Sequence, residues 1–244
     1  MKAVILAAGV GSRLGDETND KPKPLVKIHH RSLLFRQLDS LAKAGIAPEN
    51  VVVVGGYRIN QIADALTSGG FHSTKLVLNE RFEPPWGNFL SLLSAAPELR
   101  GHPFLQVDGD LLVDDEILPA LIAARGEALL ATDPHAELDG DAMKVELDAN
   151  GVLVSLDKVK VDMKKVVGEF IGVTKLSAAA GEAVFAELDK FLGEGLTDQY
   201  YERAYERLSR SGAVPFGVHL LAKSAVWREI DDAVDLADAR AKFF

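Results

Sequence analysis

The sequence predicts an α/β protein built on an open, mostly parallel (Rossmann-like) sheet with helices on both faces and a small antiparallel addition. Between residues 2 and 132, short apolar runs alternate with segments of helical periodicity, as in a parallel sheet with helical crossovers. From residue 133 onward, strand-like segments follow one another, and Ala149-Asn150-Gly151 is a hairpin-turn signal. The 244 residues contain no internal repeat and no low-complexity linker. We therefore expect a single domain over residues 1–244, divided into the parts 1–132 and 133–244.

The first predicted strand is the apolar run Lys2–Ala7, which ends before a turn at Gly9. The further strands expected in the first part are 51–54, 75–78, 103–107 and 128–132. The helices expected between the strands are 32–44, 60–66, 88–99 and 115–125. In the first of these helices the leucines fall near one face, and Gly45 follows the last turn.

The second part is expected to combine strands with a helical C-terminal region. Its strand-like segments are 144–147, 152–156, 170–175 and 214–220. Its helical segments are 178–191, 198–210 and 234–242. Asp232 and Asp235 stand where they can cap the last of these helices.

Composition excludes several classes of protein. Hydrophobic residues make up 48% and charged residues 26% of the chain, which excludes a disordered or fibrous protein. The absence of cysteine excludes disulfides, zinc–thiolate sites and cysteine nucleophiles. The apolar run Ala3–Ala8 is too short for a signal peptide or a membrane span. We therefore expect a cytoplasmic protein without a membrane partner.

The charge is unevenly distributed along the chain. The net charge is −9, but residues 1–40 carry +3 and the remainder carries −12. An acidic protein with one basic corner is poorly suited to binding a nucleic acid. It is suited to binding one small polyanion.

The densest motif is Leu6–Leu14, which reads Leu-Ala-Ala-Gly-Val-Gly-Ser-Arg-Leu and begins within the first predicted strand. Its glycines allow a tight turn that points backbone N–H groups at phosphate oxygens, and Arg13 adds a charged bidentate contact. The motif is not a P-loop, because Gly-x-x-x-x-Gly-Lys-Ser/Thr is absent. It is not the dinucleotide fingerprint either, because Leu14 stands where the third glycine is required.

A second motif, Lys-Pro-Lys-Pro-Leu-Val at Lys21–Val26, follows closely. Its two prolines stiffen the backbone and remove two backbone donors. Lys23 lies between the prolines, so its side chain is expected to be held in a fixed place. Lys21 is expected to be a solvated surface residue.

Together the two motifs resemble the signature of the nucleotide-diphospho-sugar transferase superfamily, in its pyrophosphorylase and nucleotidyltransferase branch. The resemblance implies that the glycine-rich loop wraps the triphosphate, with Arg13 and Lys23 as catalytic residues and Lys23 at the α-phosphate. It also implies that residues 1–132 bind the nucleotide and residues 133–244 bind the acceptor. The nucleotide-binding residues expected at the end of the first strand and in the loop are Leu6, Ala7, Ala8, Gly9, Gly11 and Ser12.

Carboxylates after a predicted strand indicate a metal site. Asp108 and Asp110 follow the strand 103–107, at the end of an open α/β sheet where ligands bind, and carboxylate oxygens suit Mg²⁺. By resemblance, Asp110 is a metal ligand, and Asp108 is a second ligand or an orienting group. The segment Trp227–Leu236 resembles the C-terminal element that supplies a further metal carboxylate, for which we select Asp231. Mg²⁺ is therefore the expected cofactor.

The run from Gly87 to Leu93 resembles that of cytidylyltransferases for phosphocholine-like substrates. Asn88 and Ser91 lie one helical turn apart, so both can reach the edge of a pyrimidine. Asn88 can equally cap the helix that it begins. Gly56 and Tyr57 resemble the Gly-Tyr turn after the second strand of the same branch and are expected to contact the nucleotide.

Lys144 and Lys158 resemble positions near the acceptor of this branch, and the segment Gly168–Val173, which contains Glu169, resembles the same branch. Lysines there would offset the repulsion between an anionic acceptor and CTP, although a solvated strand face is an equal alternative. Glu169 can hold an amine or a hydroxyl of the acceptor, or it can be a surface residue of a strand. The aromatic content of 7% does not by itself indicate an aromatic box for choline.

The sequence therefore predicts a Mg²⁺-dependent cytidylyltransferase, as a monomer or a homodimer. It would transfer CMP from CTP to a small phosphomonoester (phosphocholine-like) or phosphonate and release pyrophosphate. The nearest alternative is a sugar-1-phosphate nucleotidyltransferase that uses UTP, GTP or dTTP. A molybdopterin-type nucleotidyltransferase shares the Leu-Ala-Ala-Gly start, but the run from Gly87 to Leu93 disfavours it. A non-catalytic nucleotide-sensing domain is the third alternative, and it would not need the paired metal carboxylates.

Overall fold

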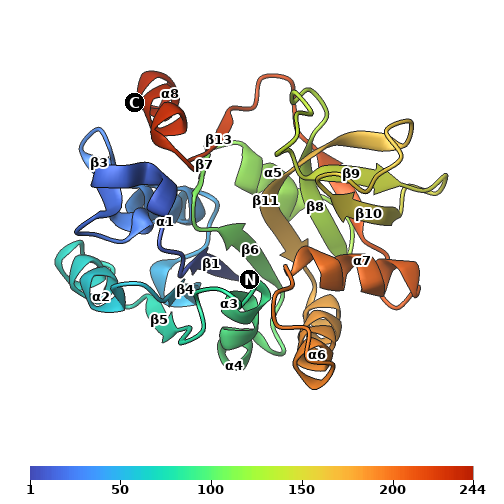
Figure 1. Cartoon of the computed structure of the whole chain (residues 1–244), viewed down its shortest axis with the longest axis horizontal. Coiled ribbons are helices and arrows are strands. Elements are labelled where there is room, and N and C mark those ends of the chain that lie inside the picture. Colours follow the sequence, from blue (N-terminus) through green and yellow to red (C-terminus); the bar gives the residue numbers. More distant parts are fainter. Residues whose placement is uncertain (244) are drawn as a thin grey trace.

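The computed structural model describes residues 1–243, and its centre is one nine-stranded mixed sheet (Figure 1). The principal strand order is β10-β9-β11-β6-β1-β4-β5, and β8 pairs with β11 and β12. The strands of this sheet are β1 (Lys2–Ala7), β4 (Val51–Gly55), β5 (Lys75–Leu78), β6 (Phe104–Asp108), β8 (Ala128–Asp133), β9 (Lys144–Leu147), β10 (Leu153–Asp157), β11 (Val166–Leu176) and β12 (Gly217–Leu220). Strands from both predicted parts of the chain therefore share one sheet.

The predicted fold class is confirmed. Strands β5, β4, β1 and β6 run parallel to one another. Strand β11 is antiparallel to β6, β8 and β9, and β10 is antiparallel to β9, which forms the antiparallel addition. Two small two-stranded sheets complete the strands: β2 (Lys27–Ile28) with β3 (Arg31–Ser32), and β7 (Leu111–Val113) with β13 (Trp227–Glu229).

Helices cover both faces of the central sheet. They are α1 (Leu33–Lys43), α2 (Ile59–Ser68), α3 (Phe89–Ser94), α4 (Ala96–Leu99), α5 (Ile117–Ala123), α6 (Ala178–Gly193), α7 (Glu202–Arg210) and α8 (Ala233–Lys242). Three short 3-10 turns, Ser12–Thr18, Lys23–Leu25 and Pro48–Asn50, lie in loops. Within residues 1–243, no helix has both the length and the apolar character that a membrane span requires.

Successive side chains of β1 point to opposite faces of the central sheet, and their contacts show which helices cover each face. Ala3, Ile5 and Ala7 pack with apolar residues of α1, α2 and α5, whereas Val4 packs with those of α3, α4, α6 and α7. Figure 1 shows α6 and α7 together beside the antiparallel end of the sheet, and α8 apart from them near β3. Helix α8 packs in a third apolar cluster, with Ile28 of β2 and Leu112 of β7 among its members.

Two predicted helices differ from the observed ones. The segment 88–99 divides at Ala95 into α3 and α4, because Pro97 has no N–H to continue the ladder of hydrogen bonds. The segment 198–210 becomes helical only at Glu202. Residues 197–199 instead pack on Gly87, whose N–H donates to Thr197 O and which leaves no room for a Cβ beside Gln199 O.

Four short strands, β2, β3, β7 and β13, were not predicted, since two or three residues carry no periodicity. Strand β11 is longer than the predicted 170–175. The predicted cap of the last helix is confirmed, because Asp232 and Asp235 form a capping box at the start of α8.

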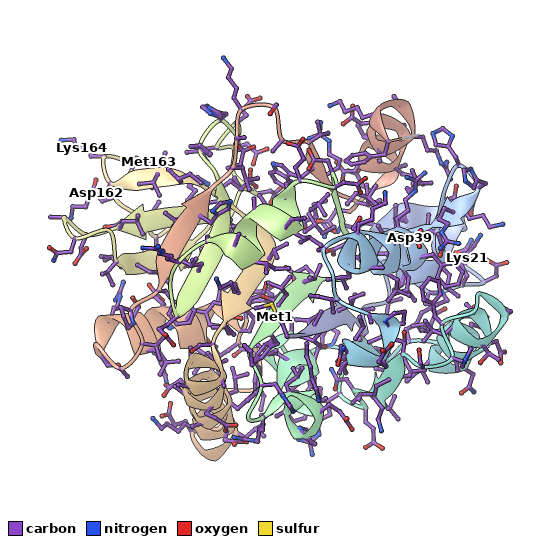
Figure 2. The ribbon with its side chains drawn as sticks, turned by 180° about the vertical axis from the view of Figure 1, so that it is seen from behind. Met1, Lys21, Asp39, Asp162, Met163 and Lys164 are labelled. Carbon is purple, nitrogen blue, oxygen red and sulfur yellow. The ribbon has the colours of Figure 1, made fainter. Side chains whose placement is uncertain are left out.

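The charged loop between β10 and β11 projects from the molecule. Figure 2 shows Asp162, Met163 and Lys164 at one end and Lys21 with Asp39 at the other. Lys165 in this loop makes long ion pairs of 3.6 Å with Asp162 and 3.9 Å with Glu146. Glu146 is buried and also accepts a hydrogen bond of 2.9 Å from Asp162 N, which ties the base of the loop to β9.

Candidate active site

The glycine-rich loop leaves the end of β1 and turns back over Lys23. Gly11 has a φ of 73°, and a Cβ at this position would lie 2.7 Å from the Cβ of Lys23. Only glycine accepts both this backbone angle and this contact. The carbonyl of Gly11 accepts hydrogen bonds from Leu14 N and Thr18 Oγ1. The loop is thereby fixed directly above the Lys23 side chain.

A cavity of about 610 Å³ opens beside this loop. Its walls contain most of the residues predicted to bind the nucleotide or to catalyse: Leu6, Ala7, Gly9, Gly11, Ser12, Arg13 and Lys23. Asp110 and Asp231 line the same cavity, and Phe82, Glu83 and Pro84 form a wall that the sequence did not indicate. The structure therefore brings the two motifs and the two predicted metal carboxylates to one place.

Ala8 and Gly56 shape the floor next to this cavity. Ala8 is buried, and its carbonyl accepts a hydrogen bond from Tyr57 N. A Cβ at Gly56 would lie 2.6 Å from the Phe82 ring and 2.8 Å from Ala8 O. Gly56 thus allows the close approach of three segments. The hydroxyl of Tyr57 accepts a hydrogen bond from Arg58.

The side chains of Asn88 and Ser91 have partners within the protein. Asn88 Oδ1 accepts a hydrogen bond of 2.9 Å from Tyr201 N, and so ties α3 to the start of α7. Ser91 is buried, and its Oγ accepts a hydrogen bond of 3.0 Å from Asn79 Nδ2. Asn79 follows β5 and was not identified from the sequence. Contact of Asn88 and Ser91 with a pyrimidine stays a prediction.

Lys23 joins the two predicted metal carboxylates. Its Nζ lies 2.9 Å from Asp110 Oδ2 and 2.9 Å from Asp231 Oδ1, and its side chain is buried. Burial lowers the pKa of Lys23, but the two carboxylates together raise it by more than burial lowers it. The net pKa therefore lies above its ordinary value. Arg13, which is mostly exposed, pairs with Asp231 Oδ2 at 2.7 Å. Partial burial raises the pKa of Asp231, but the cations Lys23 and Arg13 lower it by more, so this pKa lies below its usual value.

Three carboxylates form a group that could hold a metal ion. Oxygens of Asp110, Glu229 and Asp231 all lie within 4.8 Å of one another. Loss of hydration and the charges of Asp110 and Asp231 raise the pKa of Glu229 to about 8. A lysine ammonium already lies between two of the three, and carboxylate oxygens are hard ligands. The group therefore fits a hard divalent cation.

Glu229 was missed by the sequence reasoning. It stands two residues before Asp231, at the end of β13, and the buried Ile230 separates them. Because side chains alternate along an extended chain, residues at this spacing face the same side. The spacing of Glu229 and Asp231, with the apolar Ile230 between them, was therefore the sequence pattern that could have identified Glu229 as a third carboxylate of the site.

Asp108 lies outside this group of three carboxylates. Its Oδ2 accepts a hydrogen bond of 2.7 Å from the hydroxyl of Tyr201, and its Oδ1 accepts one of 2.8 Å from Gln106 Nε2. Burial, together with the charges of Asp110 and Glu202, raises the pKa of Asp108 well above its ordinary value. These contacts favour the orienting role over direct ligation.

A second cavity, of about 740 Å³, adjoins the first, and Arg13 and Asp231 line both. Lys158 and Glu169 line the second cavity, and their contact with an acceptor stays a prediction. Lys144 is buried instead, and its ammonium donates to the carbonyls of Asp139, Ala142 and Lys158. Since all three of its donors are used within the chain, Lys144 holds the wall of the cavity together.

The wall of the second cavity is strongly acidic. Besides the carboxylates already described, it contains Asp133, Glu137, Asp139, Asp141, Asp232 and Asp235. Within residues 1–243 the Glu169 carboxylate has no hydrogen bond or ion pair. Burial and the charges of Asp139 and Asp133 raise the pKa of Glu169 to about 7. Trp227 donates its indole N–H to Asp133 at 2.8 Å.

Comparison with known proteins places this geometry among nucleotidyltransferases. Residues 3–194 match the family model of the MobA-like NTP transferase domain. A CMP-5'-(3-aminopropyl)phosphonate synthase of Streptomyces rubellomurinus is 30% identical over 257 positions, which cover 100% of this chain and 39% of that protein. An N-acetylmuramate alpha-1-phosphate uridylyltransferase of Neisseria meningitidis is 35% identical over 150 residues, 58% of this chain and 63% of that protein. The chain thus spans less than two thirds of either relative.

A solved structure shows the same fold over nearly the whole chain. The CTP:phosphocholine cytidylyltransferase of Streptococcus pneumoniae has a TM-score of 0.76 at 22% identity, and the match covers 98% of this chain and 97% of that one. The resemblance that the sequence motifs indicated is confirmed by the family match and by the names of these relatives.

Proposed function

This chain belongs to the family of MobA-like NTP transferase domains, and from that premise we propose that it is a Mg²⁺-dependent cytidylyltransferase. It transfers CMP from CTP to a small phosphomonoester or phosphonate and releases pyrophosphate. One observation carries the proposal: two cavities meet at Arg13 and Asp231, directly beside Lys23 and the three carboxylates. Such a junction accommodates a nucleotide on one side and an acceptor on the other.

In the proposed reaction an oxygen of the acceptor attacks the α-phosphorus of CTP, and the bond from that phosphorus to the bridging oxygen of the β-phosphate breaks. The attacking oxygen of a phosphate or phosphonate is already ionised near neutral pH, so no general base is needed. The chain contributes by positioning the reactants and stabilising charge.

Each charged residue has a separate task in this reaction. Lys23 leaves the carboxylates to stabilise the charge that develops on the α-phosphate, and Arg13 stabilises the leaving pyrophosphate. The backbone N–H groups of residues 9–12 bind the phosphate chain. Asp110, Glu229 and Asp231 would hold Mg²⁺, which supplies positive charge to the phosphate oxygens when bound.

The acidic second cavity favours an acceptor that also carries an ammonium group. Glu169 is a carboxylate without a partner in a wall of carboxylates, so a cationic group of the ligand would satisfy it. Trp227 is the one aromatic residue among the described residues of this wall, which favours a primary ammonium over a quaternary one that needs an aromatic cage. The aminopropylphosphonate in the name of the Streptomyces relative is consistent with this chemistry.

A uridylyltransferase acting on a sugar 1-phosphate is the second candidate. It is favoured by the 35% identity to the Neisseria uridylyltransferase. An uncharged sugar could offer Glu169 only hydroxyl hydrogen bonds and would leave the negative charge of the acidic wall uncompensated, which is why we place this candidate second.

Pyrophosphate release tests the two candidates together. The protein is incubated with Mg²⁺ and each of CTP, UTP, ATP and GTP, against phosphocholine, phosphoethanolamine, aminoalkylphosphonates and sugar 1-phosphates. Release with CTP and an amine-bearing acceptor supports the first candidate. Release with UTP and a sugar phosphate supports the second, and nucleotide binding without release indicates a sensing domain.

A further inference from the structure

Gln37 is a buried side chain of α1 whose contacts lie beneath the carboxylate group. Its carboxamide nitrogen donates to two backbone carbonyls, Asp108 O at 2.7 Å and Leu111 O at 2.8 Å. These carbonyls flank Gly109 and Asp110, which join β6 to β7. One side chain therefore closes the short turn that carries Asp110.

The turn is also fixed against β1. The N–H of Gly109 donates to Leu6 O at 3.0 Å, and a Cβ at Gly109 would lie 2.3 Å from the same oxygen. The backbone of the turn thus packs directly on the strand that leads into the glycine-rich loop. A shift of the turn would move Asp110 relative to the nucleotide cavity.

The same turn positions the other two carboxylates. Ile230 N donates to Asp110 O at 2.9 Å, and Glu229 is paired with Leu111 in the register of β13 with β7. Glu229 and Asp231 flank Ile230 in the chain. The distances within the carboxylate group therefore depend on the shape of residues 108–111, which the Gln37 carboxamide spans.

The carboxamide is used as a donor only. Within residues 1–243, Gln37 Oε1 is buried without a hydrogen-bond partner. A buried polar atom without a partner is unfavourable, so the two donated hydrogen bonds have to offset this cost. The two donated hydrogen bonds are the feature that needs an explanation.

We infer that Gln37 is a positioning residue that holds the 108–111 turn in the shape that sets Asp110 against Glu229 and Asp231. The inference rests on the proposed function, because it takes these carboxylates as metal ligands. Gln37 touches neither nucleotide nor acceptor cavity and acts through the backbone of the turn.

The test uses Gln37→Met and Gln37→Glu, which keep the length of the side chain and remove the paired amide donors. Leu41→Ala is the matched control, since Leu41 is a buried residue of the same helix and its side chain has no hydrogen-bonding group. Two quantities are measured on each folded protein: the Mn²⁺ dissociation constant from electron paramagnetic resonance titration, and amide hydrogen exchange in the segments 108–112 and 229–231.

Both Gln37 variants should bind Mn²⁺ about 10–100-fold more weakly, the loss typical of residues that orient metal ligands. They should also exchange amide hydrogens faster in the two segments. Leu41→Ala should lower the unfolding midpoint and leave the Mn²⁺ constant and the local exchange unchanged. Wild-type Mn²⁺ affinity in Gln37→Met would overturn the inference.

Failure of the proposed function has a different result. If the wild-type protein binds no Mn²⁺ either alone or with CTP, the metal assignment is wrong, and the exchange experiment still decides the role of Gln37. Unchanged exchange at 108–112 and 229–231 in Gln37→Met would then show that the carboxamide does not hold the turn.

Discussion

At the scale of single residues, the ammonium of Lys23 is the centre of the account. It forms two ion pairs of 2.9 Å, with carboxylates 87 and 208 positions away in the chain. Replacing it removes both the charge proposed to act on the α-phosphate and the cation between the two carboxylates. These two consequences can be measured separately.

Lys23→Ala should lower the rate of pyrophosphate release by about 100-fold or more, the loss expected when a charge that stabilises a transition state is removed. Lys21→Ala is the matched control, because Lys21 makes only a 4.0 Å contact with the exposed Asp20. Steady-state kinetics with saturating CTP measures both variants. Near-normal turnover of Lys23→Ala would contradict the proposed mechanism.

The same Lys23→Ala protein should bind Mn²⁺ more tightly than the wild type when no nucleotide is present. Asp110 and Asp231 lose their resident cation, so a metal ion no longer competes with the ammonium for their oxygens. Electron paramagnetic resonance titration of the free protein measures the effect. A weaker affinity would mean that Lys23 supports the metal site rather than occupying it.

Glu169 supplies a prediction about pH. Its pKa in the folded protein is about 7, above the ordinary 4.5. A raised carboxyl pKa means that the folded chain holds the proton more strongly than the unfolded chain does. The stabilising contribution is therefore complete below about pH 4.5 and is lost as the pH rises through 7.

The unfolding free energy of Glu169→Gln minus that of the wild type should therefore be roughly 1–2 kcal/mol larger at pH 8 than at pH 5, allowing for partial solvent screening. Urea unfolding at the two pH values measures this gain, with Glu137→Gln from the same cavity wall as the control. If the difference in unfolding free energy between Glu169→Gln and the wild type does not change with pH, ionised Glu169 does not destabilise the fold.

At the scale of elements, the start of α8 separates two neighbouring aspartates with different tasks. Asp231 pairs with Lys23 and Arg13, whereas Asp232 accepts hydrogen bonds from Val234 N and Asp235 N at the helix N-terminus. Two neighbouring aspartates therefore have different roles: Asp231 is a proposed metal ligand, and Asp232 caps the helix. The pair provides a matched experiment.

Asp232→Ala should lower the free energy of unfolding by about 1 kcal/mol through loss of the cap, with turnover at saturating acceptor close to that of the wild type. Asp231→Ala should abolish metal-dependent turnover, while the α8 cap stays intact. Thermal unfolding and pyrophosphate release on both variants give the comparison. Equal losses of turnover would mean that the two carboxylates act together.

Particular residues show what the sequence could predict at this scale. The long strands and helices have periodic apolar residues, and most were predicted with errors of a few residues at their ends, although the predicted helix 88–99 divides at Ala95. Strands β7 and β13 are too short for a pattern, yet their pairing brings Glu229 beside Asp110. The partners of Asp108 and Lys144 depend on burial by distant segments, Tyr201 for the first and the carbonyl of Lys158 for the second. Sequence spacing does not contain that information.

At the scale of the whole molecule, the basic and acidic parts of the chain mainly line different cavities. The +3 segment 1–40 supplies the glycine-rich loop and Lys23 to the first cavity. The acidic remainder supplies the wall of the second. Motifs near the N-terminus therefore predicted the residues of the cavity proposed for the phosphates, whereas the cavity proposed for the acceptor is formed by residues that lie together only in the fold. This division explains why the nucleotide chemistry could be predicted more fully than the acceptor.

The measurement that tests the central claim most directly is pyrophosphate release with Mg²⁺, comparing CTP with UTP and GTP, and an amine-bearing phosphonate with a sugar 1-phosphate. The account predicts release with CTP and the amine-bearing acceptor, and loss of that release in excess chelator. Release with UTP or GTP and the sugar phosphate alone would contradict the assigned base and acceptor, and full activity in chelator would contradict the metal site.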